Sequence, residues 1–343
     1  MKLSEFDYHL PKELIAQTPL KERTSSRLMV LNKKDHLITD DLFLNLINYI
    51  NSGDLIVFND TRVLPARLFG KVDNYGKQVE IFLLKEIEKN NNTTAWECLV
   101  KPGKKLKEGV KIIFKTDFSG EVVRVNEDGT RIIRFNQKNI YPFLDEHGEM
   151  PLPPYIKEKL EEKERYQTVY SEKLGSVAAP TAGLHFTDGY LEKLKEKGIE
   201  IGFVTLDVGL GTFLPVKTDD VREHKMHSEK YEISKELVDK INEVKQNGKR
   251  VIAVGTTSMR VLESSLDANG DLIAQKGETD IFIYPPYEFK VVDALVTNFH
   301  LPKSTLLMLV SALAGKDFIF EAYEKAVDLK YRFFSFGDAM LIN

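Results

Sequence analysis

The sequence predicts an α/β protein in which a mostly parallel sheet or barrel is interrupted by an inserted antiparallel β domain. Residues 1–66 and 150–343 alternate apolar strand-like runs, polar turns and amphipathic helix-like segments. Residues 67–149 hold only short alternating runs separated by turn signals. The length of 343 residues also suits about two domains. We therefore expect an α/β domain from 1–66 and 150–343, with a β domain from 67–149.

The N-terminal part begins with a short amphipathic helix that Pro11 and Pro19 bracket. A strand is predicted over 23–32. A helix is predicted over 40–51, because its apolar residues recur at helical spacing and a glycine follows them. The buried strand over 54–62 then ends in polar residues, at an edge where α/β sheets place their ligands.

The inserted region contains the runs QVEIFLL, WECLV, GVKIIF, EVVRVN and RIIRFN, separated by turn signals such as VDNYG, KPG and EDGT. Alternation with period two favours strands that are half buried. This pattern is typical of an antiparallel barrel or sandwich of about five to seven strands.

The C-terminal part repeats the order strand, polar turn, helix. Thr187 and Ser304 are predicted helix N-caps, and Gly315 a helix C-cap. The strands are predicted over 199–207, 250–255 and 293–300, and the helices over 234–247, 256–265, 304–315 and 317–329.

The segment GSVAAPTAGLHFT, residues 175–187, consists of small and polar residues that cannot fill a core. Its glycines let backbone amides approach a ligand, and the following helix N-terminus favours anionic or electron-rich groups. Thr181, Gly183 and His185 are candidate ligand contacts in this loop. The alternative is a tight surface turn without a ligand.

Several predicted strands end in polar residues, and parallel strands would bring these side chains to one rim. Histidines there suit acid–base work, and arginine suits a carboxylate. The pattern indicates a transferase or lyase with a composite site, although a lone buried histidine is more often structural. The polar residues are Asp60 and Arg62; His185 and Thr187; Asp207; Thr256, Thr257 and Arg260; and Thr297, Asn298 and His300.

Other site types fit poorly. Gly209 and Gly211 follow a strand, but Leu214 and Pro215 replace the rest of a dinucleotide fingerprint. No glycine-rich turn carries the phosphate-binding lysine of nucleotide triphosphatases. The pair His224 and His227 with Glu229 is a weak metal motif, so we predict no metal. The single cysteine, Cys98, excludes an internal disulfide.

Charge is uneven although the net charge is only −4. Lysines at 101, 104, 105, 107, 111 and 115 face only one nearby acid, Glu108. This lysine cluster either contacts phosphates or forms a solvated hairpin rim. The N-terminus MKLSEFDYHL lacks an apolar signal core, and the longest apolar run, near 306–314, is too short to span a membrane. We expect a soluble protein of the cytoplasm.

The chain closely resembles, end to end, the S-adenosylmethionine:tRNA ribosyltransferase-isomerase family of queuosine biosynthesis. The resemblance rests on FDYHLPKELIAQTP, SRLMVL, GDLIVFNDTRVLPARL, GEMPLPPYI, ERYQTVYSEKLGSVAAPTAGLHFT, VGLGTFLPV, HKMHSEKYEI, AVGTTSMRVLES, TNFHLPKSTLLMLVSALAG and YRFFSFGDAMLI. Asp207 stands where the family motif VTLHVG has histidine, and we assign it no role.

The resemblance implies a barrel-like, mostly parallel α/β domain with an inserted antiparallel β-barrel. It also implies that the ribosyl part of S-adenosylmethionine is transferred to 7-aminomethyl-7-deazaguanine at the tRNA wobble position and isomerised. Epoxyqueuosine-tRNA forms, and adenine and methionine leave. S-adenosylmethionine is then a consumed co-substrate, and no other cofactor is expected.

That chemistry needs a proton acceptor for the acidic C5′ hydrogen, a proton donor for the leaving adenine and an anchor for the methionine carboxylate. It also needs the tRNA nucleobase to be extruded from its stack. We hypothesise base or acid roles for His185 and His300, and a carboxylate contact from Arg260. Thr256, Thr257, Thr181 and Gly183 are further candidate contacts to S-adenosylmethionine, and Asp60 and Arg62 to the ribose or the deazaguanine. Tyr166 or an aromatic from 333–336 could face the sulfonium, with core packing as the alternative.

Two other functions compete with this one. An ordinary tRNA methyltransferase would need a glycine fingerprint that the sequence lacks. A non-catalytic tRNA-binding module fits the lysine cluster but leaves the polar strand ends unexplained. We further expect a monomer, because no apolar docking stripe is evident.

Overall fold

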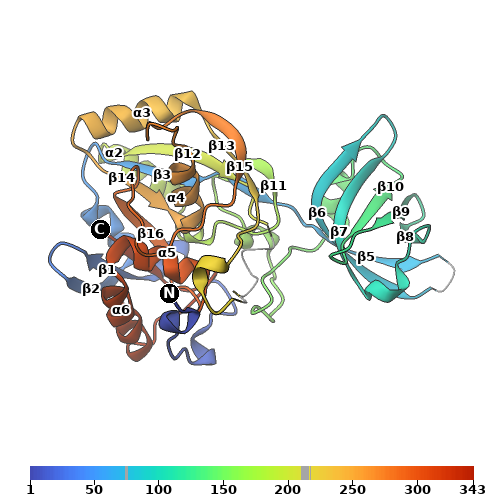
Figure 1. Ribbon diagram of the computed structural model, residues 1–343, viewed down its shortest axis with the longest axis horizontal. Helices are drawn as coiled ribbons and strands as arrows, with labels where there is room; N and C mark the ends of the chain where they lie inside the picture. Colours follow the sequence, from blue (N-terminus) through green and yellow to red (C-terminus); the bar gives the residue numbers. More distant parts are fainter. Residues whose placement is uncertain (74–75, 210–215, 217) are drawn as a thin grey trace. The chain divides into compact units, whose positions relative to one another are not determined.

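The computed structural model describes residues 1–73, 76–209, 216 and 218–343. The loop positions Gly211, Leu214 and Pro215 therefore lie outside the described residues. The chain forms two compact units (Figure 1). The first unit comprises Met1–Arg62, Pro153–Lys173 and Ala179–Asn343, and the second comprises Val63–Leu152 and Leu174–Ala178.

A nine-stranded sheet organises the first unit, in the order β15-β13-β12-β3-β14-β16-β17-β1-β2. Its centre is parallel and consists of β12 (Glu200–Leu206), β3 (Leu55–Asn59), β14 (Val251–Val254) and β16 (Ala294–Asn298). The runs LIVFN, VIAV and ALVTN are buried at every position, as expected of strands that are covered on both faces.

Antiparallel pairing flanks this centre. β17 (Ala339–Ile342) runs antiparallel to β16 and parallel to β1 (Arg27–Asn32), which pairs with β2 (Leu37–Leu42). On the other side, β13 (Glu229–Ile233) and β15 (Gln275–Thr279) extend the sheet. The mixed α/β class is confirmed, and the sheet has β15 and β2 as its two edges.

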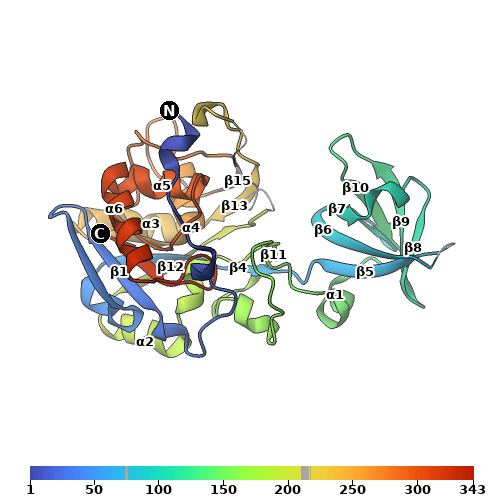
Figure 2. The ribbon, with the colours of Figure 1, turned by 90° about the horizontal axis from the view of Figure 1, so that it is seen from below.

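The predicted helices of the C-terminal part are confirmed. Thr187 Oγ1 accepts from Tyr190 N at 3.2 Å, and Ser304 Oγ accepts from Leu307 N at 3.1 Å. Figure 2 shows α2 on one side of the sheet and α4, α5 and α6 on the other. The helices are α2 (Asp188–Glu196), α3 (Lys235–Gln246), α4 (Gly255–Ser264), α5 (Thr305–Ala314) and α6 (Lys316–Asp328).

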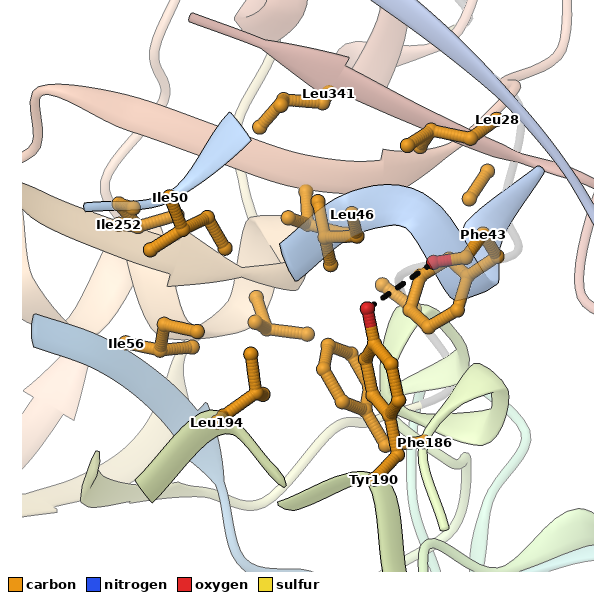
Figure 3. Close-up of a cluster of buried hydrophobic side chains, with 14 of the residues drawn as sticks. Leu28, Phe43, Leu46, Ile50, Ile56, Phe186, Tyr190, Leu194, Ile252 and Leu341 are labelled. Atoms are coloured by element: carbon orange, nitrogen blue, oxygen red, sulfur yellow. Dashed lines mark hydrogen bonds between the residues drawn. The ribbon is translucent and has the colours of Figure 1, made fainter. Parts of the chain in front are cut away.

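The core on the α2 side is shown in Figure 3. Ile56 and Ile252 point from the sheet toward Phe43, Leu46 and other apolar side chains that cover this face. The Tyr190 hydroxyl donates to the Phe43 carbonyl at 3.3 Å, so this hydroxyl is satisfied within the apolar cluster. Burial of these side chains fixes which face of each strand turns toward α2.

The helix predicted over 40–51 is wrong. Residues up to Leu42 pair with β1, and only the 3₁₀-helix η4 (Phe43–Tyr49) follows. The Asp41 carboxylate accepts from Asn45 Nδ2 at 2.7 Å and from the Tyr49 hydroxyl at 2.6 Å, which holds the segment in a tight turn. The helix between Pro11 and Pro19 is likewise reduced to one 3₁₀ turn, η2 (Lys12–Leu14).

The second unit is a closed antiparallel barrel in the order β10-β7-β6-β5-β8-β9, which confirms the predicted β-barrel. Closure brings side chains against Gly70 and Gly120, where an added Cβ would lie 2.6 Å from Ile112 and 2.8 Å from Ile133. The barrel elements are β5 (Arg67–Val72), β6 (Gln78–Lys89), β7 (Thr94–Lys101), β8 (Lys111–Lys115), β9 (Phe118–Val125), β10 (Arg131–Phe135) and helix α1 (Tyr141–His147).

Short elements complete the chain. Two short strands, β4 (Thr61–Val63) and β11 (Lys173–Ser176), pair with each other. In the described part of the chain, no helix combines the length and apolar composition that crossing a bilayer needs. The remaining 3₁₀ turns are η1 (Leu3–Phe6), η3 (Arg23–Ser25), η5 (Gly103–Lys105), η6 (Lys163–Tyr166), η7 (Thr181–His185) and η9 (Val221–Glu223).

Candidate active site

His185 ends η7 and lies at the carboxyl end of the parallel strands. Its Nδ1 is 2.8 Å from Ser26 Oγ, and its Nε2 is 3.1 Å from Asn298 Nδ2. Thr181 Oγ1 donates to Asn298 Oδ1 at 3.1 Å, which orients the amide so that its nitrogen faces the imidazole. His185 therefore carries its proton on Nδ1 and accepts at Nε2.

His185 is neutral at physiological pH. Burial, assisted by the charges of Arg332 and Arg23, lowers its pKa to about 3. Its ring also stacks on Phe43, with the centroids 5.0 Å apart. The imidazole can thus accept a proton from a ligand, but the protonated form requires a compensating negative charge nearby.

A small cavity of about 20 Å³ borders His185, which is room for about one water molecule. Arg23 lines it and donates to the carbonyls of Leu184 at 3.0 Å and Gln167 at 3.0 Å. The full lining is Pro19, Leu20, Arg23, Ser26, Arg165, Leu184, His185, Ser335, Phe336 and Gly337. The cavity is therefore electropositive.

Arg260 lies on α4 and forms a buried ion pair with Glu229, the first residue of β13. Its Nη1 donates to Glu229, whose other oxygen accepts from Gly209 N at 2.9 Å. Nε and Nη2 of Arg260 are buried and have no hydrogen-bond partner among the residues that the structure describes. Leaving such donors unsatisfied costs about 1–3 kcal/mol each, so this edge of the guanidinium is suited to a ligand.

Thr257 adds a third unpaired group beside Arg260. Its hydroxyl oxygen is buried and has no partner in the described residues, and residues three apart lie on the same face of a helix. Gly255, at the start of the same helix, has φ +84°, and a Cβ there would lie 3.7 Å from Ala182. The start of α4 thus packs directly against η7, the segment that ends at His185.

Gly183 and Thr256 are placed by packing as well. A Cβ on Gly183 would lie 1.9 Å from the Tyr170 hydroxyl and 2.8 Å from Thr168. Glycine is therefore required at this position to let η7 approach Thr168 and Tyr170, whether or not a ligand binds. Thr256 is buried at the first turn of α4.

Neither Asp60 nor Arg62 lines the cavity at His185. Asp60 accepts from Thr205 Oγ1 at 2.7 Å, and its pKa is raised mainly by burial. It lines a separate cavity of about 260 Å³ together with Lys173. Arg62 donates to Ser171 Oγ at 3.0 Å and is ion-paired with Glu164 at 2.6 Å.

His300 is held by a different set of groups. Its Nε2 is 3.0 Å from Thr297 Oγ1, its amide donates to the Tyr323 hydroxyl at 3.0 Å, and its carbonyl accepts from Tyr8. Burial lowers its pKa to about 3. Thr297 and Asn298 are consecutive in β16, so they point to opposite faces of the sheet. The two histidines are therefore bonded to opposite faces, contrary to the expectation of one shared cluster.

The aromatic candidates separate in a similar way. Tyr166 is fully buried and packs edge-on against Phe336, with ring centroids 5.9 Å apart. Phe336 lines the cavity at His185, whereas the ring of Phe333 is buried against that of Phe299, with the centroids 5.1 Å apart.

Asp207, to which the sequence assigns no role, accepts a hydrogen bond from Thr61 Oγ1 at 3.2 Å. Its pKa is raised chiefly by burial.

Comparison with known proteins agrees with this architecture. The protein family described as "Queuosine biosynthesis protein" matches residues 3–342. The chain belongs to this family.

Relatives cover the whole chain. The S-adenosylmethionine:tRNA ribosyltransferase-isomerase of Clostridioides difficile is 56% identical over 344 residues, covering 100% of both chains. The protein of the same name from Finegoldia magna is 56% identical over 345 residues, covering 100% of this chain and 99% of its own. A crystal structure titled S-adenosylmethionine tRNA ribosyltransferase, from Thermotoga maritima, is 43% identical with a TM-score of 0.56 and covers 99% of this chain and 100% of its own.

Within this family fold, sequence reasoning missed several residues that shape the site. Arg23 and Ser26 precede β1 and line the cavity, although a polar run before a strand is an ordinary turn signal. The sequence pattern places Glu229 only in a weak metal motif, whereas the structure pairs it with Arg260. The signal that could have singled it out is a carboxylate in an otherwise alternating strand, EKYEI.

Proposed function

We propose that this chain transfers the ribosyl moiety of S-adenosylmethionine to 7-aminomethyl-7-deazaguanine at the tRNA wobble position and isomerises it. Epoxyqueuosine-tRNA is formed, with release of adenine and methionine. Relatives 56% identical along the entire chain carry the name of this activity. In the structure, the proposal rests on the buried Arg260 guanidinium, whose Nε and Nη2 lack partners within the described part of the chain.

Arg260 is the proposed anchor for the methionine carboxylate. A carboxylate binds side-on to Nε and Nη2 through two parallel hydrogen bonds, while Glu229 keeps Nη1. The Thr257 hydroxyl supplies a third donor to the same anion. Bound in this way, S-adenosylmethionine lies at the start of α4, beside η7 and His185. It serves as a co-substrate, and the proposal requires no further cofactor.

His185 is the proposed proton acceptor. The sulfonium acidifies the ribose C5′ hydrogen, and that proton passes to Nε2 while the electron pair stays on C5′, stabilised by the adjacent sulfur. The neutral form that burial enforces is the form that can do this at pH 7. Asn298 covers Nε2 in the free protein and must release it to the substrate. The proton then becomes available to adenine as it leaves.

The direct test is incubation with S-adenosylmethionine and tRNA that carries 7-aminomethyl-7-deazaguanine. We expect one free adenine and one free methionine for each modified tRNA, measured by chromatography and mass spectrometry. A methylated tRNA without adenine would indicate a methyltransferase. Binding of tRNA without consumption of S-adenosylmethionine would indicate a non-catalytic binding module.

We also propose that the enzyme acts as a monomer in the cytoplasm. The chain mass is 39.2 kDa, and light scattering in solution should return this value. Twice that mass at micromolar concentration would contradict the monomer.

A further inference from the structure

The cavity at His185 continues into a larger groove. The groove has a volume of about 430 Å³, within the usual range for small-ligand sites, and it shares Arg165 and Phe336 with the cavity. One wall comes from residues 17–21 and the other from 158–162 and Arg165. The groove therefore places a ligand of nucleotide size next to the small cavity that borders His185.

Arg23 and Arg165 line the cavity at His185, and Arg165 also lines the groove. Arg332 lies beside the groove, because it bonds to Thr18 in the groove wall. Within the described residues, Arg23, Arg165 and Arg332 form no ion pair. They donate instead to backbone carbonyls: Arg165 to Leu20 at 2.5 Å, and Arg332 to Thr18. Arg332 Nη1 is buried and finds no hydrogen-bond partner in the ranges 1–73, 76–209, 216 and 218–343. The negative charges of Glu164 and Asp188 act on Arg23, and that of Asp338 acts on Arg332, without forming an ion pair. A guanidinium without a paired carboxylate suits an anionic ligand such as phosphate.

We infer that this groove receives the extruded wobble nucleotide of the tRNA, with a backbone phosphate held at the Arg23, Arg165 and Arg332 end. The inference rests on the proposed function, because it takes tRNA as the substrate. Base extrusion needs such a pocket, since the reacting base cannot be reached within a stacked strand. The exposed carboxylates of Glu158, Glu161 and Glu162 line the groove together with Lys21 and Lys159, whereas the lining of the cavity at His185 holds arginines and no carboxylate. The anionic part of the ligand therefore belongs at the cavity.

Electrostatics at His185 agree with this placement. Burial is the main cause of the lowered pKa of His185, and the charges of Arg332 and Arg23 lower it further, so both act on the imidazole. A bound phosphate would offset these charges and raise the pKa of His185 toward the range in which it can exchange protons. Binding of the nucleotide would in this way prepare the base for its reaction.

Charge removal at the groove tests the inference. Arg165→Gln and Arg332→Gln should each lower the salt slope of tRNA binding by about 0.7–0.9, the value for one lost phosphate contact. Arg165→Lys should keep the slope. Lys235→Gln, an exposed lysine on α3, is the matched control and should also keep it. The KM for S-adenosylmethionine should stay unchanged in all four variants.

A second test uses the unaltered protein, so it does not depend on the folding of a variant. In a synthetic anticodon stem-loop, a methylphosphonate replaces either phosphate next to the wobble nucleotide. We expect at least about a tenfold loss of affinity at one of these two positions and little loss in the stem. Equal affinity at all positions, or unchanged salt slopes in the arginine variants, would overturn the inference. If the wild-type protein releases no adenine at all, the proposed function fails instead.

Discussion

The two faces of β16 hold one buried histidine each, and their surroundings differ. On the face toward η7, His185 bonds to Asn298 and borders an electropositive cavity. On the other face, the imidazole of His300 bonds to Thr297, and the backbone amide of His300 donates to the Tyr323 hydroxyl. Burial lowers the pKa of both to about 3. Burial and a shifted pKa therefore do not distinguish the two, whereas the open cavity and its arginines do.

Replacing each histidine gives the largest expected difference between the faces. His185→Ala should lower kcat by about 10²–10⁴, because the proton acceptor is lost. His300→Ala should change kcat by less than about tenfold and lower the free energy of unfolding by about 1–3 kcal/mol, since it removes a buried, bonded side chain. Adenine release and urea unfolding measure the two effects. Equal kcat losses would place both histidines in the chemistry.

The unpaired donors on α4 give the next largest effect. Arg260→Lys keeps a charge for Glu229 but removes the side-on fork, so the KM for S-adenosylmethionine should rise about 10–100-fold. Thr257→Val should raise this KM about 2–10-fold and leave stability equal or higher, because it deletes a buried hydroxyl without a partner. A destabilised Thr257→Val protein with unchanged KM would mean that the hydroxyl serves the fold alone.

The pH dependence of the free energy of unfolding distinguishes His185 from His300, because only His185 should respond to a bound anticodon stem-loop. The unfolded pKa is about 6.5 and the folded value about 3, so the unfolded chain binds more protons between these values. Stability is therefore full above pH 6.5 and falls by about 1.4 kcal/mol per pH unit for each histidine as pH drops toward 3. Urea unfolding from pH 7 to 5 should show this slope, and His300→Gln should reduce it. Adding the anticodon stem-loop should reduce the part that His185 contributes.

Charge reversal at the exposed lysines of the barrel unit should have the smallest effect on activity. It shows how much exposed charge contributes to tRNA binding, for comparison with the buried groups. Lys104→Glu with Lys105→Glu should weaken tRNA binding about threefold to tenfold and flatten its salt dependence. Adenine release at saturating tRNA should not change. An unaltered salt slope would make this lysine cluster a solvated rim.

Much of the framework could be predicted from local sequence. The apolar runs of β3, β14 and β16, the caps Thr187 and Ser304, and the alternation within the barrel all follow from short-range patterns. The structure of segment 40–51 could not be predicted in this way. Its apolar residues recur at helical spacing, but its first residues pair with β1, and the Asp41 side chain bonds to Tyr49. Long-range pairing of this kind leaves no local signal.

By itself, the sequence determined which residues carry chemistry and that they follow strands, because residue type and period are local properties. Only the tertiary structure decided which of them meet. Side chains of adjacent strand residues point in opposite directions, and this separates His185 from His300. Arg260 pairs with Glu229, 31 residues away in sequence, and Arg23 donates to the carbonyl of Leu184. Both contacts depend on how distant segments of the chain pack together. No periodicity in the chain encodes these contacts.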